Sequence, residues 1–252
     1  MIPETVQNAQ VIFVSHSGGK DSQAMLAQLI RLGLKDRLVV VHADLGEMEW
    51  EPMHGWIERN AFGLPVHIVR SEMSFDTMAR KYGRLPSGQQ QFCTDFLKTT
   101  PIEAFIHSYM AERGLTRAIN ATGMRAEESR RRALKSPLQV SEMRRPRKFP
   151  DHTIHDWLPI FGYTHEEVVQ EITMAGQTMH EVYSKGFSRL SCVFCVNGRI
   201  EEHKRAAELR PELAAKMAKL ERDLGRTIRV KQVKGVKLPK FLDEYLAIPQ
   251  PA

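Results

Sequence analysis

The stretch "VIFVSHSGGKDSQAMLAQLI", residues 11–30, constrains the fold of this chain more than any other. Val11–Val14 form a short apolar run with β-branched ends, which is typical of a buried strand. From Ser22 onward the apolar residues fall at helical spacing. Two glycines lie at the junction, where the backbone must turn sharply. The pattern predicts a strand, a tight loop and a helix in immediate succession.

The loop between the predicted strand and helix has the chemistry of an anion site. It contains hydroxyl groups, Gly18, Gly19 and a lysine, Lys20. A helix N-terminus offers free N–H groups and the positive end of the helix dipole, and the lysine adds a mobile cation. The spacing is not that of the GxxxxGK[ST] loop, and GxGxxG is absent. The loop therefore predicts a phosphate site of another kind.

Strand and helix patterns alternate through the first 160 residues. The helix pattern at 101–114 starts with proline and ends with glycine. Alternation of this kind predicts an α/β fold with a parallel sheet of about five strands and helices on both faces. Ligands of such sheets bind beyond the carboxyl ends of the strands. Ser17–Ser22, Asp44 and residues 123–125 all follow predicted strands and fall at those ends.

The pattern of the sequence changes near residue 160, where the alternation of strands and helices ends. Beyond it the patterns are helical and highly charged, and Pro211 breaks one long helical pattern into two. We expect an α/β domain over residues 1–160. A helical, basic C-terminal cap that contains a Cys-x-x-Cys pair is expected over residues 161–252.

Composition excludes several classes of protein. With 42% hydrophobic residues the chain can bury a substantial core. Its longest apolar runs are too short to span a bilayer, and the N-terminus lacks the pattern of a signal peptide. Three cysteines are too few for a disulfide framework. We expect a cytoplasmic protein with no membrane partner; the oligomeric state is left open.

The positive charge is concentrated in two stretches of a chain whose formal net charge is +6. Residues 130–148 hold eight basic residues and one acidic residue, Glu142, and residues 226–240 hold six basic residues and no acidic one. Such runs are either solvated surface or the footprint of a phosphate-rich partner such as DNA or RNA. The alternatives stay open at this point.

The segment "SGGKDS" resembles the pyrophosphate-binding loop (PP-loop) of the adenine nucleotide α-hydrolase superfamily, the ATP pyrophosphatases. The resemblance implies that ATP, with Mg²⁺, binds here through its β- and γ-phosphates. The implied nucleotide-binding residues are Ser15, Ser17, Gly18, Gly19, Lys20, Asp21, Ser22 and Gly123. Asp44 would lie near the nucleoside, and its alternative role is a plain turn at the end of a strand.

Four more segments resemble the phosphoadenylyl-sulfate reductase branch of this superfamily. They are "QQQFCTDFLKTTP", "ATGMRAEESRRRALK", "HDWLPIFGYTHEEVV" and "HEVYSKGFSRLSCVFC", and together with the loop they occur in the family's order between residues 15 and 195. The resemblance implies that Lys20 binds phosphate. Lys98, Arg125 and Arg132 are cations near predicted strand ends, and we expect them to pair with phosphate or a substrate oxyanion during catalysis. For at least one arginine of 130–132, a solvated helix face is the alternative.

Cys93, Cys192 and Cys195 allow three interpretations, and we expect them to meet at the carboxyl edge of the sheet. Related enzymes bind a [4Fe–4S] cluster through four cysteines, whereas this chain has three. Three thiolates can hold a cluster with one iron open, or a zinc ion with His180 or His203 as the fourth ligand. The third interpretation is that they bind no metal.

The complete loop favours an enzyme that uses ATP. Reduction of adenylyl sulfates is not expected, because no cysteine follows Cys195 to act as the nucleophile. We expect cleavage of ATP between the α- and β-phosphates, giving AMP or an adenylylated acceptor and pyrophosphate. Sulfur transfer to nucleic acid, with a partner protein supplying the sulfur, is the natural extension. The alternatives are a sulfate adenylyltransferase subunit and a nucleotide-binding accessory module of a phage, plasmid or CRISPR locus with weak or no turnover.

Overall fold

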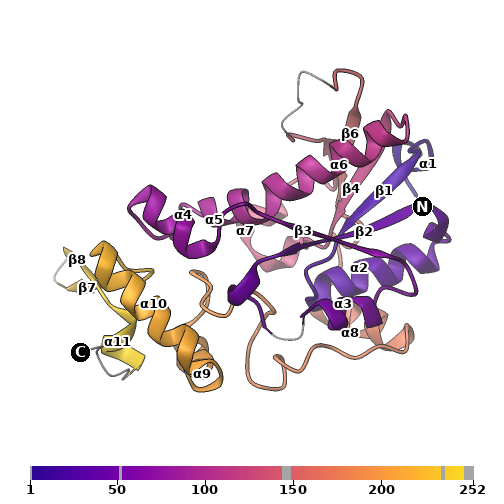
Figure 1. The fold of residues 1–252 in the computed structure, drawn as a ribbon. Coiled ribbons are helices and arrows are strands. Elements are labelled where there is room, and N and C mark those ends of the chain that lie inside the picture. The colour runs from indigo at the N-terminus through magenta and orange to yellow at the C-terminus, as the bar shows by residue number, and fades with distance from the viewer. Residues whose placement is uncertain (1, 51–52, 144–148, 234–235, 247–252) are drawn as a thin grey trace. The chain divides into compact units, whose positions relative to one another are not determined.

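The computed structural model describes residues 2–50, 53–143, 149–233 and 236–246 (Figure 1). Its strands are β1 (Val11–Ser15), β2 (Leu38–Asp44), β3 (Val66–Arg70), β4 (Arg117–Thr122), β5 (Leu138–Val140), β6 (Thr153–Trp157), β7 (Val230–Val233) and β8 (Val236–Pro239). Its α-helices are α1 (Glu4–Gln7), α2 (Lys20–Arg31), α3 (Met53–Arg59), α4 (Phe75–Tyr82), α5 (Phe92–Thr94), α6 (Thr100–Glu112), α7 (Arg130–Ala133), α8 (His165–Met174), α9 (Ile200–Leu209), α10 (Pro211–Leu224) and α11 (Leu242–Leu246). Among the described residues, no helix combines the length and the apolar character needed to cross a bilayer.

Six strands form one sheet in the order β3-β2-β1-β4-β6-β5. Strand β1 pairs in parallel with β2 and β4, and β4 pairs in parallel with β6. The prediction of an α/β fold with a largely parallel sheet is thereby confirmed. The sequence pattern did not assign β6, nor did it reveal β5, an antiparallel edge strand beside β6. Strand β5 is three residues long, too short to show a periodic pattern.

Side chains of β1 alternate between two hydrophobic cores, one on each face of the sheet. Ile12 and Val14 pack in the core that includes buried residues of α2 and α8. Val11 and Phe13 pack in the other core, which includes Ile106 and a second buried residue of α6. Figure 1 shows α6 on one side of the strands and α2 and α8 on the other. Because both faces of β1 are covered, its first four residues form a continuous apolar run.

The chain divides into two compact units made of interleaved segments. The sheet unit consists of Met1–Ala43, Pro52–Val69 and Pro101–Leu190. The second unit consists of Asp44–Glu51, Arg70–Thr100 and Ser191–Ala252. This division differs from the expected boundary near residue 160. Helix α8 stays with the sheet because its apolar face is part of the sheet's core, and the segments that follow β2 and β3 group with the C-terminal residues.

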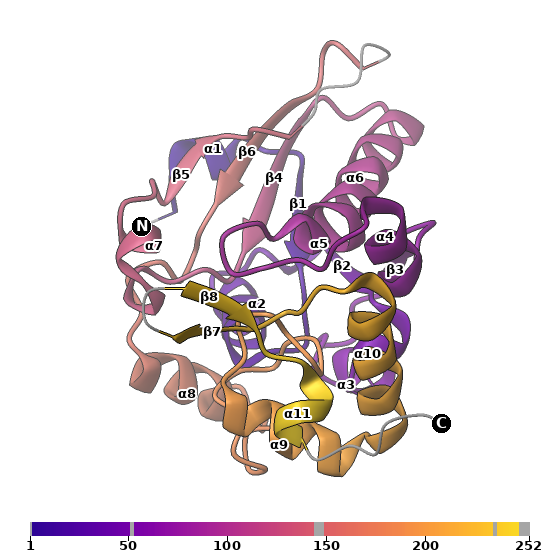
Figure 2. The ribbon, with the colours of Figure 1, turned by 90° about the vertical axis from the view of Figure 1, so that its left-hand side faces the viewer.

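The second unit is mainly helical but contains one β-hairpin. Helices α9, α10 and α11 pack together (Figure 2). As expected, Pro211 separates two helices, and it does so as the first residue of α10. Strands β7 and β8 pair antiparallel within the stretch that the sequence analysis read only as a basic run. The expected cap is therefore not entirely helical.

Glu221 on α10 ties three parts of the second unit together. The side chain is fully buried. Its carboxyl oxygens accept hydrogen bonds from the N–H of Ile228, at 2.9 Å, and from the N–H of Leu242, at 2.6 Å. Burial raises the pKa of Glu221 to about 7, because loss of water disfavours the carboxylate more than the two N–H donors favour it.

We expect Glu221 to make the stability of the protein pH-dependent. Its folded-state pKa is raised from 4.5 to about 7, so the native state holds the proton more tightly than the unfolded state. The associated stability is fully present below about pH 4.5 and is lost as the pH rises through about pH 7. Glu221→Gln should flatten the fall in unfolding free energy across this range, by up to about 1.4 kcal/mol per pH unit.

Urea denaturation across this pH range measures the effect, with Glu212→Gln on the exposed face of the same helix as the control. The control should keep the wild-type pH dependence. An unchanged slope in Glu221→Gln would show that the carboxyl group titrates at its ordinary pKa.

Candidate functional site

Strands β1 and β4 are neighbours in the sheet although β2 and β3 lie between them in the chain. The sheet order reverses here, which is where ligands of open α/β sheets bind. Residues 16–19 connect β1 to α2, and Gly123 follows β4 directly. Ser15 at the end of β1 approaches β4 through its Oγ, which lies 3.4 Å from Asn120 Oδ1. The loop predicted from the sequence therefore lies at the switch point of the sheet.

Gly123 brings the backbone after β4 against the first turn of α2. A Cβ atom at this position would lie 2.7 Å from the carbonyl oxygen of Asp21 and 2.8 Å from the backbone nitrogen of Ser22. Both neighbours are backbone atoms of a helix, which cannot yield as the end of a flexible side chain does. The close approach requires glycine at this position.

The N–H groups at the start of the loop bind side chains of the loop itself. Ser17 N–H donates to Ser22 Oγ at 3.2 Å, and Ser22 Oγ donates to the carbonyl of Gly19 at 2.9 Å. Gly18 N–H donates to His16 Nδ1 at 3.1 Å. Gly18 has a φ of +78°, which L side chains rarely adopt. The loop is thus held in one conformation by its own donors and acceptors.

His16 acts in this loop as a neutral hydrogen-bond acceptor. The side chain is 1% exposed. Burial, and to a smaller extent the nearby His42, lowers the pKa of His16 from 6.5 to about 3. Its Nδ1 therefore keeps a lone pair for Gly18 N–H. The sequence analysis did not single out His16, and its one sequence signal is a polar residue directly after an apolar strand.

Other parts of the sheet unit cover the loop. The indole Nε1 of Trp56 donates to the carbonyl of Gly18 at 3.0 Å. A Cβ atom at Gly18 would lie 2.5 Å from Met53 Sδ. Lys20 N–H donates to the hydroxyl of Tyr183 at 2.9 Å. Sequence reasoning missed these contacts because they join segments far apart in the chain.

Two of the predicted catalytic cations meet at one carboxylate. Asp21 Oδ2 accepts from Lys20 Nζ at 2.8 Å, and Asp21 Oδ1 accepts from Arg125 Nε at 2.7 Å. Arg125 also pairs with Glu127 and donates to the carbonyl of Tyr163 at 3.1 Å. The Arg125 side chain is 5% exposed. Asp21 therefore joins the loop after β1 to the loop after β4.

The third predicted cation of the sheet unit is placed differently. Arg132 on α7 pairs with Glu128, the last residue of the 3₁₀ turn that precedes α7. Arg130 and Arg131, on the same short helix, are exposed. The exposure of these two arginines agrees with the alternative given above, a solvated helix face.

Asp44, the predicted nucleoside contact, lies in the second unit at the end of β2. Its Oδ1 accepts from Gly46 N–H at 2.7 Å, and its Oδ2 accepts from Arg70 Nε at 3.0 Å. Both residues of this ion pair line a cavity of about 390 Å³. The other residues that line it are Leu45, Gly46, Glu47, Ser71, Glu72, Met73, Ser74, Phe75 and Leu97. Asp44 therefore both stabilises the turn at the end of β2 and lines an open cavity.

The three cysteines line one cavity of the second unit, about 50 Å³ in volume. All three are thiols and none forms a disulfide. Lys98 lines the same cavity. It belongs to a π-helical turn, Asp95–Thr99, between α5 and α6. Such turns are rare and frequently mark functional positions, and nothing in the sequence pattern distinguished this one from an ordinary helix.

The thiols and the lysine influence each other electrostatically. Burial raises the pKa of Cys192 to about 11, while the Lys98 ammonium group opposes this rise. Burial also raises the pKa of Cys93. The cysteines, Cys192 first among them, raise the pKa of Lys98. At neutral pH the cluster therefore holds a protonated lysine beside the protonated thiols of Cys93 and Cys192, and Lys98 favours any thiolate that forms there.

The two histidines considered as zinc ligands have other partners. His203 Nδ1 lies 3.0 Å from Tyr245 Oη, and its Nε2 lies 2.8 Å from the carbonyl oxygen of Cys195. Both ring nitrogens of His203 are therefore engaged. His180 lies in the sheet unit, where its Nδ1 accepts from Val182 N–H at 3.2 Å. These contacts do not favour zinc.

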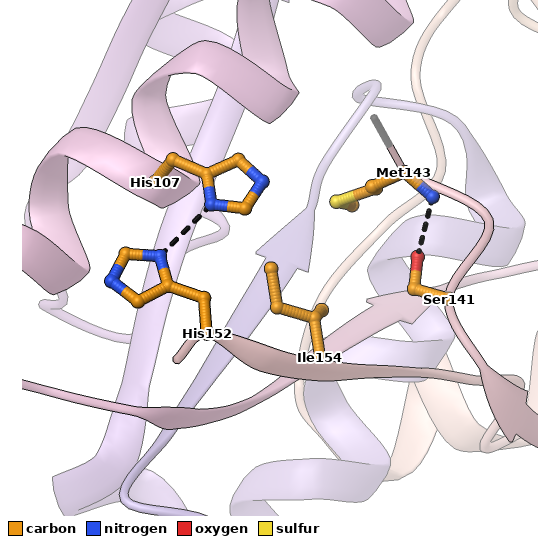
Figure 3. A pocket seen from close by; sticks show the side chains of 5 residues that line it. All are labelled: His107, Ser141, Met143, His152 and Ile154. Carbon is orange, nitrogen blue, oxygen red and sulfur yellow. Dashed lines mark hydrogen bonds between the residues drawn. The ribbon is translucent and has the colours of Figure 1, made fainter. Parts of the chain in front are cut away.

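His107 and His152 form a histidine pair in the sheet unit, away from the loop (Figure 3). His107 Nδ1 and His152 Nδ1 are 2.9 Å apart, so one nitrogen carries the proton and the other accepts it. Burial lowers the pKa of His152. Ser141, Met143 and Ile154 also line this pocket, whose volume of about 10 Å³ is room for about one water molecule. The pocket is too small for a nucleotide.

The structure describes only part of the two basic stretches, 130–148 and 226–240. Residues 144–148 of the first stretch and residues 234–235 of the second lie outside the described residues. For the rest of 230–239 only the backbone is described. The proposal that these stretches bind DNA or RNA remains a prediction.

Curated relatives of this chain match part of their own length. Two are uncharacterized proteins of Methanocaldococcus jannaschii, each 26% identical, over 73% and 80% of this chain and over 36% and 45% of the relative. A third is an uncharacterized 37.8 kDa protein in the gpa 5′ region of Escherichia phage 186, 30% identical over 56% of this chain and 40% of the relative. The chain thus spans less than half the length of these relatives.

Solved structures with a similar arrangement have low sequence identity to this chain. One is phosphoadenylyl-sulfate reductase from Candida auris in a phosphate complex, with 15% identity, 74% of this chain and 83% of that chain covered, and a TM-score of 0.49. Another is Candida glabrata FMN adenylyltransferase with FMN and an ATP analogue, with 17% identity, 74% and 54% covered, and a TM-score of 0.46. At these values the likeness carries no argument about the site.

The family follows from the sequence itself. The model of the phosphoadenosine phosphosulfate reductase domain matches residues 11–197. This match begins with β1 and ends just beyond the Cys-x-x-Cys pair, so it includes the loop, the residues after β4 and all three cysteines. The chain belongs to the phosphoadenosine phosphosulfate reductase domain family.

Proposed function

We propose that the protein binds ATP through Ser17–Ser22 and cleaves it between the α- and β-phosphates. The observation that carries this proposal is the complete SGGKDS loop at the switch point of the sheet. Beside the loop, Gly123 lies so close to the backbone of α2 that only glycine fits there. Lys20 and Arg125 both bind the carboxylate of Asp21. A helix N-terminus with two adjacent cations suits a polyphosphate.

The charges of the loop balance before any nucleotide binds. Lys20 and Arg125 are paired with Asp21, and Arg125 is also paired with Glu127. A polyphosphate would compete with Asp21 for the ammonium group of Lys20. In the nucleotide-free protein both oxygens of Asp21 bind cationic side chains of the chain itself. The metal is expected to arrive with the triphosphate, as part of the substrate.

The loop would determine which phosphate bond breaks. If it holds the β- and γ-phosphates, the α-phosphorus stays open to an acceptor oxygen or to water. A bond forms between that oxygen and the α-phosphorus, and the bond to the α–β bridging oxygen breaks, with its electron pair leaving on pyrophosphate. Lys20 and the loop N–H groups would stabilise the charge that develops on this leaving group. The products are AMP or an adenylylated acceptor, and pyrophosphate.

For the nucleoside we propose Asp44 as a contact, the role that the family resemblance implies for it. The carboxylate of Asp44 accepts hydrogen bonds from Arg70 and Gly46. These partners would hold it in place for a hydroxyl or amino group of the nucleoside.

We further propose nucleic acid as the acceptor and sulfur as the group transferred, with a partner protein as the sulfur donor. The basic stretches 130–148 and 226–240 support a nucleic-acid acceptor, and the thiol cluster supports sulfur chemistry. Cys93, Cys192 and Cys195 would hold a [4Fe–4S] cluster with one iron open, and such a cluster supplies a site that binds sulfur. The three cysteines supply enough thiolates for a cluster with one open iron but not the four protein ligands of a structural zinc site. The buried ammonium group of Lys98 also suits an anionic cluster better than Zn²⁺.

A nucleotide-binding accessory module with weak turnover is the second candidate. It is favoured by the internal hydrogen bonds of the loop, whose N–H groups at Ser17, Gly18 and Lys20 all have partners in the free protein. The relative from phage 186 is compatible with a role in a mobile element. Product analysis separates the two candidates.

The first experiment uses ATP labelled at the α- and γ-positions with Mg²⁺, with and without tRNA or DNA as acceptor. We expect labelled AMP or labelled acceptor, and labelled pyrophosphate. Lys20→Ala removes a charge-assisted contact and should weaken nucleotide binding about ten- to a hundredfold, or roughly 1.5–3 kcal/mol. Label that appears as ADP and free phosphate would refute the proposed bond cleavage, and binding without any product would favour the accessory module.

A second prediction concerns the close approach at Gly123. Gly123→Ala puts a methyl group against the backbone of α2, which should separate the two loops and cost about 1–3 kcal/mol of stability. ATP affinity, measured by isothermal titration calorimetry, should fall in parallel. Gly162→Ala is the matched control, because a Cβ atom there meets nothing within 4 Å. Equal affinities for the two variants would show that the backbone after β4 does not shape the phosphate site.

A third prediction concerns Lys98. Replacing it with methionine removes the charge that favours thiolates, so the pKa of Cys192 should rise further. Iodoacetamide alkylation, followed by mass spectrometry, should slow about tenfold for each unit of pKa. Lys216→Met, on the exposed ion pair with Glu47, should leave the rate unchanged.

A separate experiment tests the proposed cluster with the wild type and Cys192→Ser. Anaerobic reconstitution should give a brown wild-type protein that contains iron and sulfide, and Cys192→Ser should incorporate neither. A colourless wild-type protein without bound iron would mean that the thiols bind no cluster.

A further inference from the structure

The turn that contains Tyr183 lies directly on the loop, and both belong to the sheet unit. Tyr183 Oη accepts hydrogen bonds from Lys20 N–H at 2.9 Å and from Leu190 N–H at 3.3 Å. A Cβ atom at Gly19 would lie 3.5 Å from this hydroxyl and 3.6 Å from Leu190 Cβ. The hydroxyl oxygen therefore reaches the backbone of the loop at the point where α2 begins.

The position of this oxygen is chemically distinctive. Lys20 is the first residue of α2, and its N–H is one of the donors that a helix leaves without a partner of its own. The positive end of the helix dipole favours an electron-rich oxygen here. An oxygen that accepts two N–H bonds at a helix N-terminus has the environment of a bound phosphate oxygen.

We propose that, in the nucleotide-free protein, the hydroxyl of Tyr183 occupies the position of a pyrophosphate oxygen and must leave when the polyphosphate binds. The inference rests on the proposed function of the same loop. A phosphate oxygen carries charge and is a stronger acceptor than a neutral hydroxyl, so it displaces Tyr183 from Lys20 N–H. Part of the binding free energy is then used to break the two bonds that Tyr183 accepts.

Tyr183 thereby lowers the affinity of the loop for anions. Removing its oxygen leaves two N–H groups of the free protein without their partner, which destabilises the free state. Phosphate gives Lys20 N–H a partner again, so the variant should bind phosphate more tightly. If Tyr183 instead stayed in place and supported the loop, the same change would weaken binding. The direction of the effect distinguishes the two roles.

The test compares Tyr183→Phe with the wild type by calorimetric titration with magnesium pyrophosphate. We expect about tenfold tighter binding by the variant, the factor for the loss of one or two neutral hydrogen bonds. Its melting temperature without ligand should be lower than that of the wild type. Tyr163→Phe is the control, because its hydroxyl bonds to Glu171 Oε2 at 3.2 Å and not to the loop, and it should bind pyrophosphate like the wild type.

A measurement on the wild type avoids any doubt about folding. Hydrogen exchange followed by mass spectrometry should show faster exchange at Leu190 N–H when pyrophosphate is added, while Lys20 N–H stays protected. Equal or weaker binding by Tyr183→Phe, or an unchanged Leu190, would overturn the displacement of Tyr183 while leaving the proposed function intact. Absence of pyrophosphate and ATP binding in all three proteins would overturn the proposed function, and this inference with it.

Discussion

The contact of Asp21 with two cations organises the sheet unit around its switch point. Lys20 extends from the loop after β1 and Arg125 from the loop after β4, and the carboxylate of Asp21 binds both. The side chains of Lys20 and Arg125 are 8% and 5% exposed. Arg125 also pairs with Glu127, so removal of the Asp21 carboxylate would leave the buried ammonium group of Lys20 uncompensated, at a cost of about 3–5 kcal/mol. The same contact keeps Gly123 against the first turn of α2. A buried site thus keeps its cations without a ligand, because an internal anion neutralises them.

The features that the sequence predicted are those that depend on local pattern. The apolar run at Val11–Val14 predicted a strand that is buried on both faces. The two glycines before a helical pattern predicted the loop that follows it. Gly123 was expected near the loop because it follows a predicted strand, beyond whose carboxyl end ligands bind. The meeting of the three cysteines was expected from the resemblance to enzymes that bind a cluster with them.

The features that the sequence did not predict depend on distant contacts. Tyr183 lies 163 residues from the backbone nitrogen it binds, and no periodicity connects the two. The neutral state of His16 results from burial, which only the packed structure determines. The π-helical turn at Lys98 differs from an α-helix by one hydrogen-bond step, so its side chains follow nearly the same pattern. The hairpin of β7 and β8 was hidden because its residues were read for charge rather than for pairing.

The interleaving of the two units has a consequence for the order in which the chain folds during synthesis. Every segment of the sheet unit has been made by Leu190, whereas the second unit also needs the residues from Ser191 onward. Its first two segments, Asp44–Glu51 and Arg70–Thr100, therefore leave the ribosome well before their partners. N-terminal parts of proteins generally fold first, so the sheet can form while these two segments wait. The thiol cluster, which draws on Cys93 and on Cys192 and Cys195, therefore cannot form until every segment of the sheet unit has been made.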